Sequence, residues 1–295
     1  MIVAVLLALL IAIGFAFAGL AVRVAGARNQ LRPSLESIGL GALANFFDTL
    51  GIGSFATTTA YIKLRGLVPD SFIPATLNVG HALPTIAQAL IFIKLVKVDP
   101  LLLVACIAAA VAGSIVGAPA VQRLPVRTVQ GAVGIALIIA AALYAAANLN
   151  LMPGGGEALS LSPALMVVAI AAHFVLGVLM MFGIGLYAPS LVMLSLMGLN
   201  PTAAFPIMMG ACAFLMPVSA IGFMRSERID LRVVLGIAIG GIPAVLLAAL
   251  VVKSLPMTAL RWGVVVVVMY AATLLLRSAF KPTVVTAAED PVGAR

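Results

Sequence analysis

Charged residues are scarce in this chain. It has 17 Lys and Arg and 9 Asp and Glu among 295 residues, so that 9% of the residues are charged, whereas soluble domains carry about 25%. Residues 158–224 contain no charged side chain, and this stretch is long enough for several membrane crossings of about 20 residues each. The scarcity of charge excludes a soluble enzyme, a nucleic-acid-binding protein and a disordered chain.

Cysteine and histidine, which supply many metal and catalytic sites, are also few. Cys106 and Cys212 lie inside apolar runs, where a cysteine is more often a small buried hydrophobe than part of a disulfide or a metal pair. The sequence contains no HExxH motif, and Ser54 in GIGSF lacks the Gly-x-Ser-x-Gly setting of a serine hydrolase. We therefore expect no enzyme activity, no cofactor and no metal site.

Apolar residues make up most of the chain. They amount to 64% of it, and the mean hydropathy is +1.25. The apolar runs are continuous rather than alternating, which predicts an all-α polytopic membrane protein and not a β-barrel. For the first run, Met1–Val22, a signal peptide is the alternative, but no basic region precedes it and its positive charges follow it, so we expect a retained helix. Further apolar segments cover residues 36–62, 70–93, 100–121, 128–147, 163–197, 200–224, 231–252 and 257–276.

The two halves of the chain resemble each other. Gly-Ile-Gly occurs at residues 51–53 and again at 183–185, and at the same offset of 132 residues Pro69 matches Pro201. Further matches keep the same order: Gly66-Leu67 with Gly198-Leu199, Pro74 with Pro206, Pro84 with Pro217, Val98-Asp99 with Ile229-Asp230, and Leu124-Pro125 with Leu255-Pro256. Such order in low-complexity apolar sequence indicates an internal duplication. The predicted parts are residues 1–34, an N-terminal transmembrane helix with a basic loop; 35–147, the first repeat; 148–162, a linker; 163–277, the second repeat; and 278–295, a disordered tail.

Two of the apolar segments are interrupted by Gly-Ile-Gly. The longer one, residues 163–197, has about 35 residues and at 1.5 Å per residue exceeds a bilayer core, so we expect the helix to break there. If both interrupted segments are hairpins that enter and leave on one side, twelve Lys and Arg lie inside and four outside. Single crossings would give ten and six, so the positive-inside rule favours hairpins. The twelve are Arg23, Arg28, Arg32, Lys63, Arg65, Arg123, Arg127, Arg225, Arg228, Arg232, Arg277 and Lys281, and the four are Lys94, Lys97, Lys253 and Arg261.

Hairpins also give each repeat an odd number of crossings. The predicted fold is therefore two inverted repeats of helical segments, each with a Gly-broken hairpin helix, plus an extra N-terminal helix. Inverted repeats with broken helices place a binding site near the membrane midplane, at the interface between the repeats.

These motifs resemble those of a known family, the TauE/SafE sulfite exporters. The resemblance covers roughly residues 36–277 and depends on Gly-Ile-Gly after a small-residue helix, a Gly-x-x-Pro turn, a later Val-Asp, a Gly-x-Pro at Gly117 or Gly241, and Leu-Pro before the last helix. The strings here are GIGSF and GIGLY, whereas the family is usually richer in glycine after the first triplet. The resemblance implies a bacterial inner-membrane transporter of small sulfur-containing anions.

The two breaks also predict an anion site. Half-helices that begin at Gly53 and Gly185 would point backbone amides and positive dipole ends into the protein. The alternative for each nearby hydroxyl is a hydrogen bond to a carbonyl of its own helix. The predicted substrate-binding residues are Gly51, Gly53, Ser54, Thr57, Thr58, Thr59, Asn78, His81, Thr85, Gly183, Gly185, Tyr187 and Ser190.

One helix carries a polar stripe. Asn78, His81 and Thr85 are spaced to share one face of the segment 70–93, and Gln88 continues it by one turn. The second half has no such stripe, so we expect an asymmetric site with oxyanion donors in the first half. The alternative is a hydrogen-bonded packing stripe.

Asp48 is the only acidic residue well inside an apolar run. Acids in membrane segments are costly and usually functional. A carboxylate beside an anion repels it unless protonated, so Asp48, together with His81, is our candidate for proton coupling. The alternative is that Asp48 caps the half-helix after the break. For His173 we expect a packing or interfacial role.

The broken helices and the polar residues beside them predict a transporter with an anion site. The resemblance implies that it is a secondary transporter, specifically an exporter, of sulfite, thiosulfate or organosulfonates across the bacterial inner (plasma) membrane. A potential of about 100 mV, negative inside, drives each negative charge outward with roughly 2.3 kcal/mol, so export needs no coupling. The alternatives are a transporter of carboxylates, a transporter of cations or metals, and an intramembrane enzyme. The expected partners are a small anion and the lipid bilayer, with no nucleic acid; proton coupling and a homodimer stay open.

Overall fold

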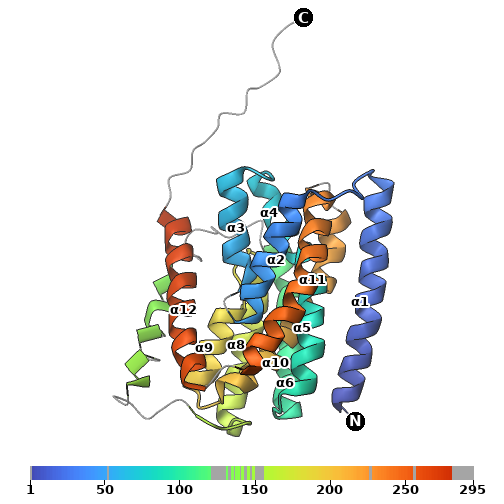
Figure 1. Ribbon diagram of the computed structural model, residues 1–295. Helices are drawn as coiled ribbons and strands as arrows, with labels where there is room; N and C mark the ends of the chain where they lie inside the picture. Colours follow the sequence, from blue (N-terminus) through green and yellow to red (C-terminus); the bar gives the residue numbers. More distant parts are fainter. Residues whose placement is uncertain are drawn as a thin grey trace, which may run out of the picture.

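The computed structural model is an all-α bundle (Figure 1). It describes residues 2–51, 53–120, 156–225, 228–254 and 257–280, with parts of 131–149, and these ranges contain no strand. Six helices in the described ranges are long and apolar enough to cross a membrane: Ile2–Ala27, Ile73–Leu95, Pro100–Ala118, Pro163–Met180, Pro201–Arg225 and Leu231–Val251. The chain is thus a polytopic helical membrane protein, which confirms the prediction from the apolar runs.

Helix α1 (Ile2–Ala27) runs along the outside of the bundle (Figure 1). The loop after it ties this helix to the end of α10, because the Arg28 guanidinium donates to the carbonyl of Met224 at 2.9 Å. The Leu231 amide, at the start of α11, donates to the Gln30 side chain at 3.0 Å. These bonds place residues 28–30 and 224–231 at the same end of the molecule.

The first Gly-Ile-Gly separates α2 (Leu35–Thr49) from α3 (Ser54–Arg65). Gly51 and Gly53 have φ angles of +95° and +86°, which side chains disfavour, so glycine lets the chain turn back here. Glu36 at the start of α2 forms an ion pair with Arg65 at the end of α3 at 2.8 Å, so the start of α2 and the end of α3 lie together (Figure 1). The hydrogen bond from Arg65 lowers the pKa of the partly exposed Glu36 carboxyl.

Three helices follow the first pair. After a 3-10 turn at Asp70–Phe72 come α4 (Ile73–Gly80) and α5 (Ala82–Leu95), which are separated at His81. Helix α6 (Pro100–Ala120) follows a short loop, and its first free amides, Leu101 and Leu102, donate to the Asp99 carboxylate at 2.8 and 2.9 Å.

The second Gly-Ile-Gly lies between α8 (Pro163–Met180) and α9 (Tyr187–Leu196). The segments that flank this pair meet, because the Asn200 amide donates to the carbonyl of Ala158 at 2.8 Å. The neighbouring Leu159 accepts from Asp99, at the loop between α5 and α6, at 2.9 Å. We call the end of a helix pair that lies away from its Gly-Ile-Gly turn the mouth of the pair. The mouth of the second pair therefore lies at the end of the bundle opposite to the mouth of the first pair (Figure 1).

Three long helices follow: α10 (Pro201–Arg225), α11 (Leu231–Ser254) and α12 (Met257–Phe280). Asp230 accepts from the Arg232 amide at 2.9 Å at the start of α11, as Asp99 does at the start of α6. The two matched Asp residues of the duplication are thus both helix caps. Helix α12 extends to Phe280, and the rest of the predicted tail, 278–295, lies outside the described residues.

Glycine allows two long helix contacts between the halves. Helix α2 packs along α11, where a Cβ added to Gly41 would lie 2.4 Å from the carbonyl oxygen of Ile237. Helix α8 packs along α6, where a Cβ added to Gly177 would lie 2.1 Å from the carbonyl oxygen of Ala110. The first helix of each half therefore rests on a helix of the other half.

Candidate functional site

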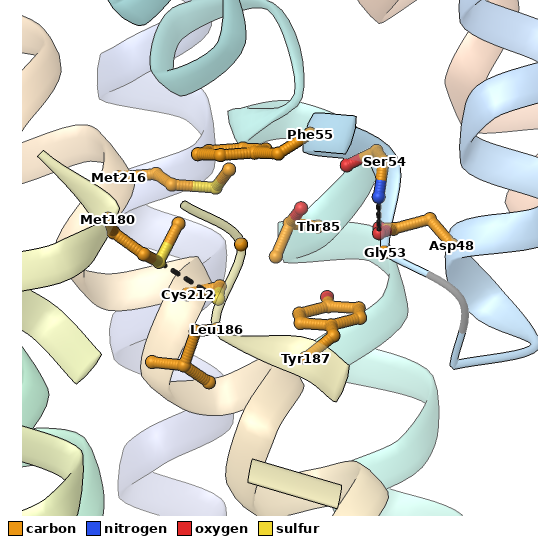
Figure 2. Close-up of a pocket in the computed structure, with 11 residues that line it drawn as sticks. Asp48, Gly53, Ser54, Phe55, Thr85, Met180, Leu186, Tyr187, Cys212 and Met216 are labelled. Atoms are coloured by element: carbon orange, nitrogen blue, oxygen red, sulfur yellow. Dashed lines mark hydrogen bonds between the residues drawn. The ribbon is translucent and has the colours of Figure 1, made fainter. Parts of the chain in front are cut away.

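The two helix breaks meet at one small cavity in the middle of the bundle (Figure 2). It has room for about one water molecule. Its lining residues are Asp48, Gly53, Ser54, Phe55, Thr85, Met180, Gly185, Leu186, Tyr187, Cys212 and Met216. These come from both pairs of half-helices and from α5 and α10, so the cavity lies between the two halves of the chain.

The contacts across the cavity are reciprocal. A Cβ added to Gly53 would lie 3.8 Å from Cβ of Tyr187, and a Cβ added to Gly185 would lie 3.5 Å from Cβ of Phe55. Gly53 and Gly185 are matched residues of the duplication, and so are Phe55 and Tyr187, at the offset of 132. Each break thus faces the start of the half-helix that follows the other break.

The N-termini of α3 and α9 open onto this cavity. Gly53 and Leu186 are the residues before the two helices, and neither supplies a side-chain cap. The first backbone amides of a helix have no partner within it and carry its positive dipole end. Two such ends at one buried site form a place where an anion can bind.

Asp48 links the first break to the second. One of its carboxylate oxygens accepts from the Ser54 amide, the first residue of α3, and the other accepts from Nε2 of Gln88 at 2.9 Å. Gln88 in turn accepts through Oε1 from the Tyr187 hydroxyl, at the start of α9. Asp48 is therefore the cap of α3, and the side-chain amide of Gln88 connects this cap to the start of α9.

The cavity has a second wall that contains sulfur. Met180 comes from the end of α8, and Cys212 and Met216 lie one turn apart on α10. The Cys212 thiol donates to the Met180 sulfur at 3.5 Å (Figure 2). All three side chains are almost fully buried.

His81 is held away from the cavity lining by two other helices. The amide nitrogen of Asn45 donates to the Gly41 carbonyl at 2.8 Å, so its oxygen faces Nδ1 of His81 at 2.9 Å. That nitrogen therefore carries the proton, and Nε2 accepts from the Thr58 hydroxyl at 3.0 Å. His81 is neutral in this arrangement and joins α2 to α3.

His173 makes the same kind of contact in the second half. Its Nδ1 donates to the Ala169 carbonyl at 2.8 Å, and its Nε2 accepts from the Ser190 hydroxyl at 3.0 Å. Ser190 follows Gly185 by five residues, as Thr58 follows Gly53. In both halves a histidine therefore fixes the second half-helix through the matched hydroxyl.

The predicted site residues divide into two groups. Those that line the cavity are Asp48, Gly53, Ser54, Thr85, Gly185 and Tyr187. Those that lie elsewhere are Gly51, Thr57, Thr58, Thr59, Asn78, His81, Gly183 and Ser190. Thr57 donates to the carbonyl of Ser54 within its own helix at 2.8 Å. Asn78 donates to the Pro74 carbonyl at 3.0 Å, and its buried Oδ1 has no hydrogen-bond partner in the described part of the protein.

Several lining residues were not predicted. The sequence matches offer a signal for one of them, because Phe55 matches Tyr187, a predicted site residue. Leu186, Met180, Cys212 and Met216 sit in uniformly apolar sequence, where nothing marks the side that faces a cavity. Among the described residues, no three His, Cys, Asp or Glu side chains are grouped so that they could hold a metal ion.

Comparison with known proteins finds one family. Residues 165–294 match the model of the family described as Sulfite exporter TauE/SafE. No curated protein and no solved structure matches the chain. Members of the matched family are transporters rather than enzymes. The second half of the chain is therefore similar to the TauE/SafE sulfite exporter family, in agreement with the resemblance of its Gly and Pro motifs.

Proposed function

We propose that the protein is a secondary transporter, working as an exporter, of small sulfur-containing anions such as sulfite, thiosulfate or organosulfonates in the bacterial inner membrane. The observation that carries this proposal is the meeting of the α3 and α9 N-termini at one buried cavity. Backbone amides with positive dipole ends attract an anion without any buried basic side chain. The family match supports sulfur oxyanions over carboxylates and over metal cations.

The cavity is closed in this arrangement. It has room for about one water molecule, so a four-atom anion such as sulfite enters only when the walls separate. The two half-helix pairs open toward opposite ends of the bundle (Figure 1). We assign them to inverted repeats, so that movement of one half against the other would expose the cavity to one side at a time.

The charges of the described helix ends support one orientation. The end with the mouth of the first pair carries nine basic residues in or beside the ends of α1, α3, α10, α11 and α12, and the other end carries Lys94 and Lys97 at the end of α5. The nine are Arg23, Arg28, Arg32, Lys63, Arg65, Arg225, Arg228, Arg232 and Arg277. The positive-inside rule then puts the first mouth in the cytoplasm. A membrane potential that is negative inside favours outward movement of anions, which supports export.

The Asp48 contacts support a coupling route for a proton. Protonation would place a donor on an oxygen that now accepts from the Ser54 amide or from Gln88. If the oxygen facing Gln88 is protonated, that amide must turn, and Tyr187 then loses its acceptor. A proton on Asp48 would thus remove a negative charge from the site and also loosen the start of α9.

Efflux from proteoliposomes tests the function. The purified full chain is reconstituted in vesicles loaded with labelled sulfite or thiosulfate, and an inside-negative potential is imposed. We expect faster efflux of the labelled anion than from equally loaded vesicles without protein. We expect no comparable flux of acetate or of divalent metal ions. Flux of a carboxylate or a metal alone would contradict the proposal.

A paired variant ties this flux to the cavity. Gly185→Leu would project a large side chain between the half-helices, because even a Cβ there lies 3.5 Å from Phe55. Gly222→Leu on α10 is the matched control, since an added Cβ there meets no atom within 4 Å. We expect loss of flux in the first variant only. Equal flux in both variants would exclude this cavity from the transport route.

A further inference from the structure

The cavity presents two chemically different walls (Figure 2). On one side lie the hydroxyl side chains of Ser54, Thr85 and Tyr187, which we call the hydroxyl wall, beside the first turns of α3 and α9. On the other side lie Met180, Cys212 and Met216, which we call the sulfur wall, with Leu186 and Phe55 beside them. The Tyr187 hydroxyl already donates to Gln88, and the Asp48 carboxyl lies on the same side, so the hydroxyls of Ser54 and Thr85 are the side-chain donors of this wall. Strong side-chain donors to an occupant of the cavity therefore lie on one side only.

The sulfur wall offers an anion no strong donor. A thioether has no hydrogen to donate, and a thiol is a weak donor. The single thiol is already engaged, because Cys212 donates to the Met180 sulfur. Met180, Cys212 and Met216 are at most 2% exposed, so water does not hydrate an atom that faces them. An oxygen with negative charge at this wall would lose its water without gaining a partner.

From this arrangement we infer that the sulfur wall selects the shape of the substrate. It admits anions that direct three oxygens to the hydroxyl wall and a different atom to the sulfur wall. That atom is the lone-pair apex of sulfite, the terminal sulfur of thiosulfate or the carbon of a sulfonate. Sulfate and phosphate have a fourth oxygen, which falls on the sulfur wall, and they are rejected. The inference rests on the proposed function, that this cavity binds an anion.

Sulfate and thiosulfate form the sharpest pair of probes. They carry the same charge and differ in one atom, because a terminal sulfur replaces one oxygen. Polarisable thioethers and a thiol accommodate this sulfur well, as they do other soft groups. Any difference in affinity between the two anions therefore reports on the wall that the exchanged atom meets.

Titration calorimetry of the purified full chain in detergent measures both affinities. We expect sodium thiosulfate to bind at least about tenfold more tightly than sodium sulfate, the scale at which a pocket discriminates by one group. Cys212→Ser places a strong donor on the wall at almost the same volume, and Met216→Gln does so with a longer side chain. Both variants should lower the preference, mainly by improving sulfate binding.

Cys106→Ser is the matched control. Cys106 is also fully buried, but it lies on α6 and does not line the cavity, so the preference should stay as in the unmodified protein. Equal affinities for thiosulfate and sulfate in the unmodified protein would overturn the inference and leave the proposed function standing. Binding of neither anion, with sulfite also silent, would overturn both.

The variants decide the role of the wall. A preference that survives unchanged in folded Cys212→Ser and Met216→Gln would overturn the assignment to these side chains. If Met216→Gln does not fold, Cys212→Ser alone gives the answer, because it changes one atom.

Discussion

At the scale of single residues, Asp48 is both a helix cap and part of the lining of the candidate site. Its carboxylate caps the start of α3 through the Ser54 amide. It also lies in the lining of the cavity where we place the anion. If Asp48 were protonated, its hydrogen-bond partners would have to move. One of these partners is Gln88, which connects Asp48 to Tyr187.

Replacement by asparagine separates the two roles. Asp48→Asn keeps the shape of the side chain but presents an NH2 group to one of its two donors, the Ser54 amide or Nε2 of Gln88. We therefore expect the free energy of unfolding to fall by about 1–3 kcal/mol. If the proton travels with the anion, substrate still binds and exchange across proteoliposomes persists, while accumulation driven by a pH gradient disappears. Asparagine caps helices about as well as aspartate. Transport with its full pH dependence would therefore reduce Asp48 to a cap.

The residue scale is also where the sequence says least about neighbours. The period of the helix predicts that Asn78, His81 and Thr85 share one face, and in the structure all three are at most 1% exposed. The period does not say which neighbour each one meets. Of the three, Thr85 lines the cavity, whereas Asn78 bonds to the Pro74 carbonyl and His81 bonds to Asn45 and Thr58.

At the scale of secondary-structure elements, glycine sets how closely helices approach. Gly41 on α2 lies against the backbone of α11, so a methyl group there cannot be accommodated by turning a side chain. We expect Gly41→Ala to separate α2 from α11 and to cost about 1–3 kcal/mol, the range for overpacking. Thermal unfolding in detergent measures the loss.

Two positions earlier on the same helix, Gly39 provides the control. A Cβ added there meets no atom within 4 Å. Gly39→Ala should leave the unfolding temperature unchanged or raise it, because alanine favours helix over glycine by about 1 kcal/mol. Equal losses in the two variants would mean that helix propensity, and not the contact with α11, sets the effect.

Elements were more predictable than sites. The breaks followed from Gly-Ile-Gly and from a segment too long for one crossing, and glycine is needed there because φ is positive at Gly51, Gly53 and Gly183. The contact of α2 with α11 and of α8 with α6 could not be predicted. Nearly every helix is apolar all round, so its pattern does not mark the face that meets another helix rather than lipid.

At the scale of the whole molecule, the orientation of the chain can be tested directly. Single cysteines at Arg28 and Arg65 should react with a membrane-impermeant reagent from the cytoplasmic side, because both residues lie at the end with the first mouth. A cysteine at Lys97, near the opposite mouth, should react only from outside. Cys106 and Cys212 are buried and should stay silent. Labelling of Arg28 and Arg65 from opposite sides would remove the inverted-repeat arrangement.

The crossing of α2 with α11 has a consequence for how the protein is made. The glycine face of α2 has no partner until α11 has been synthesised, almost 200 residues later along the chain. At about 5–20 residues per second, a ribosome needs roughly 10–40 s to supply that partner. During this time the first half-helix pair, with its Gly-Ile-Gly turn and Asp48, lies in the membrane without α11 beside it. Insertion must therefore either shelter this pair or delay its entry into the bilayer, so the order of synthesis becomes part of how the site is assembled.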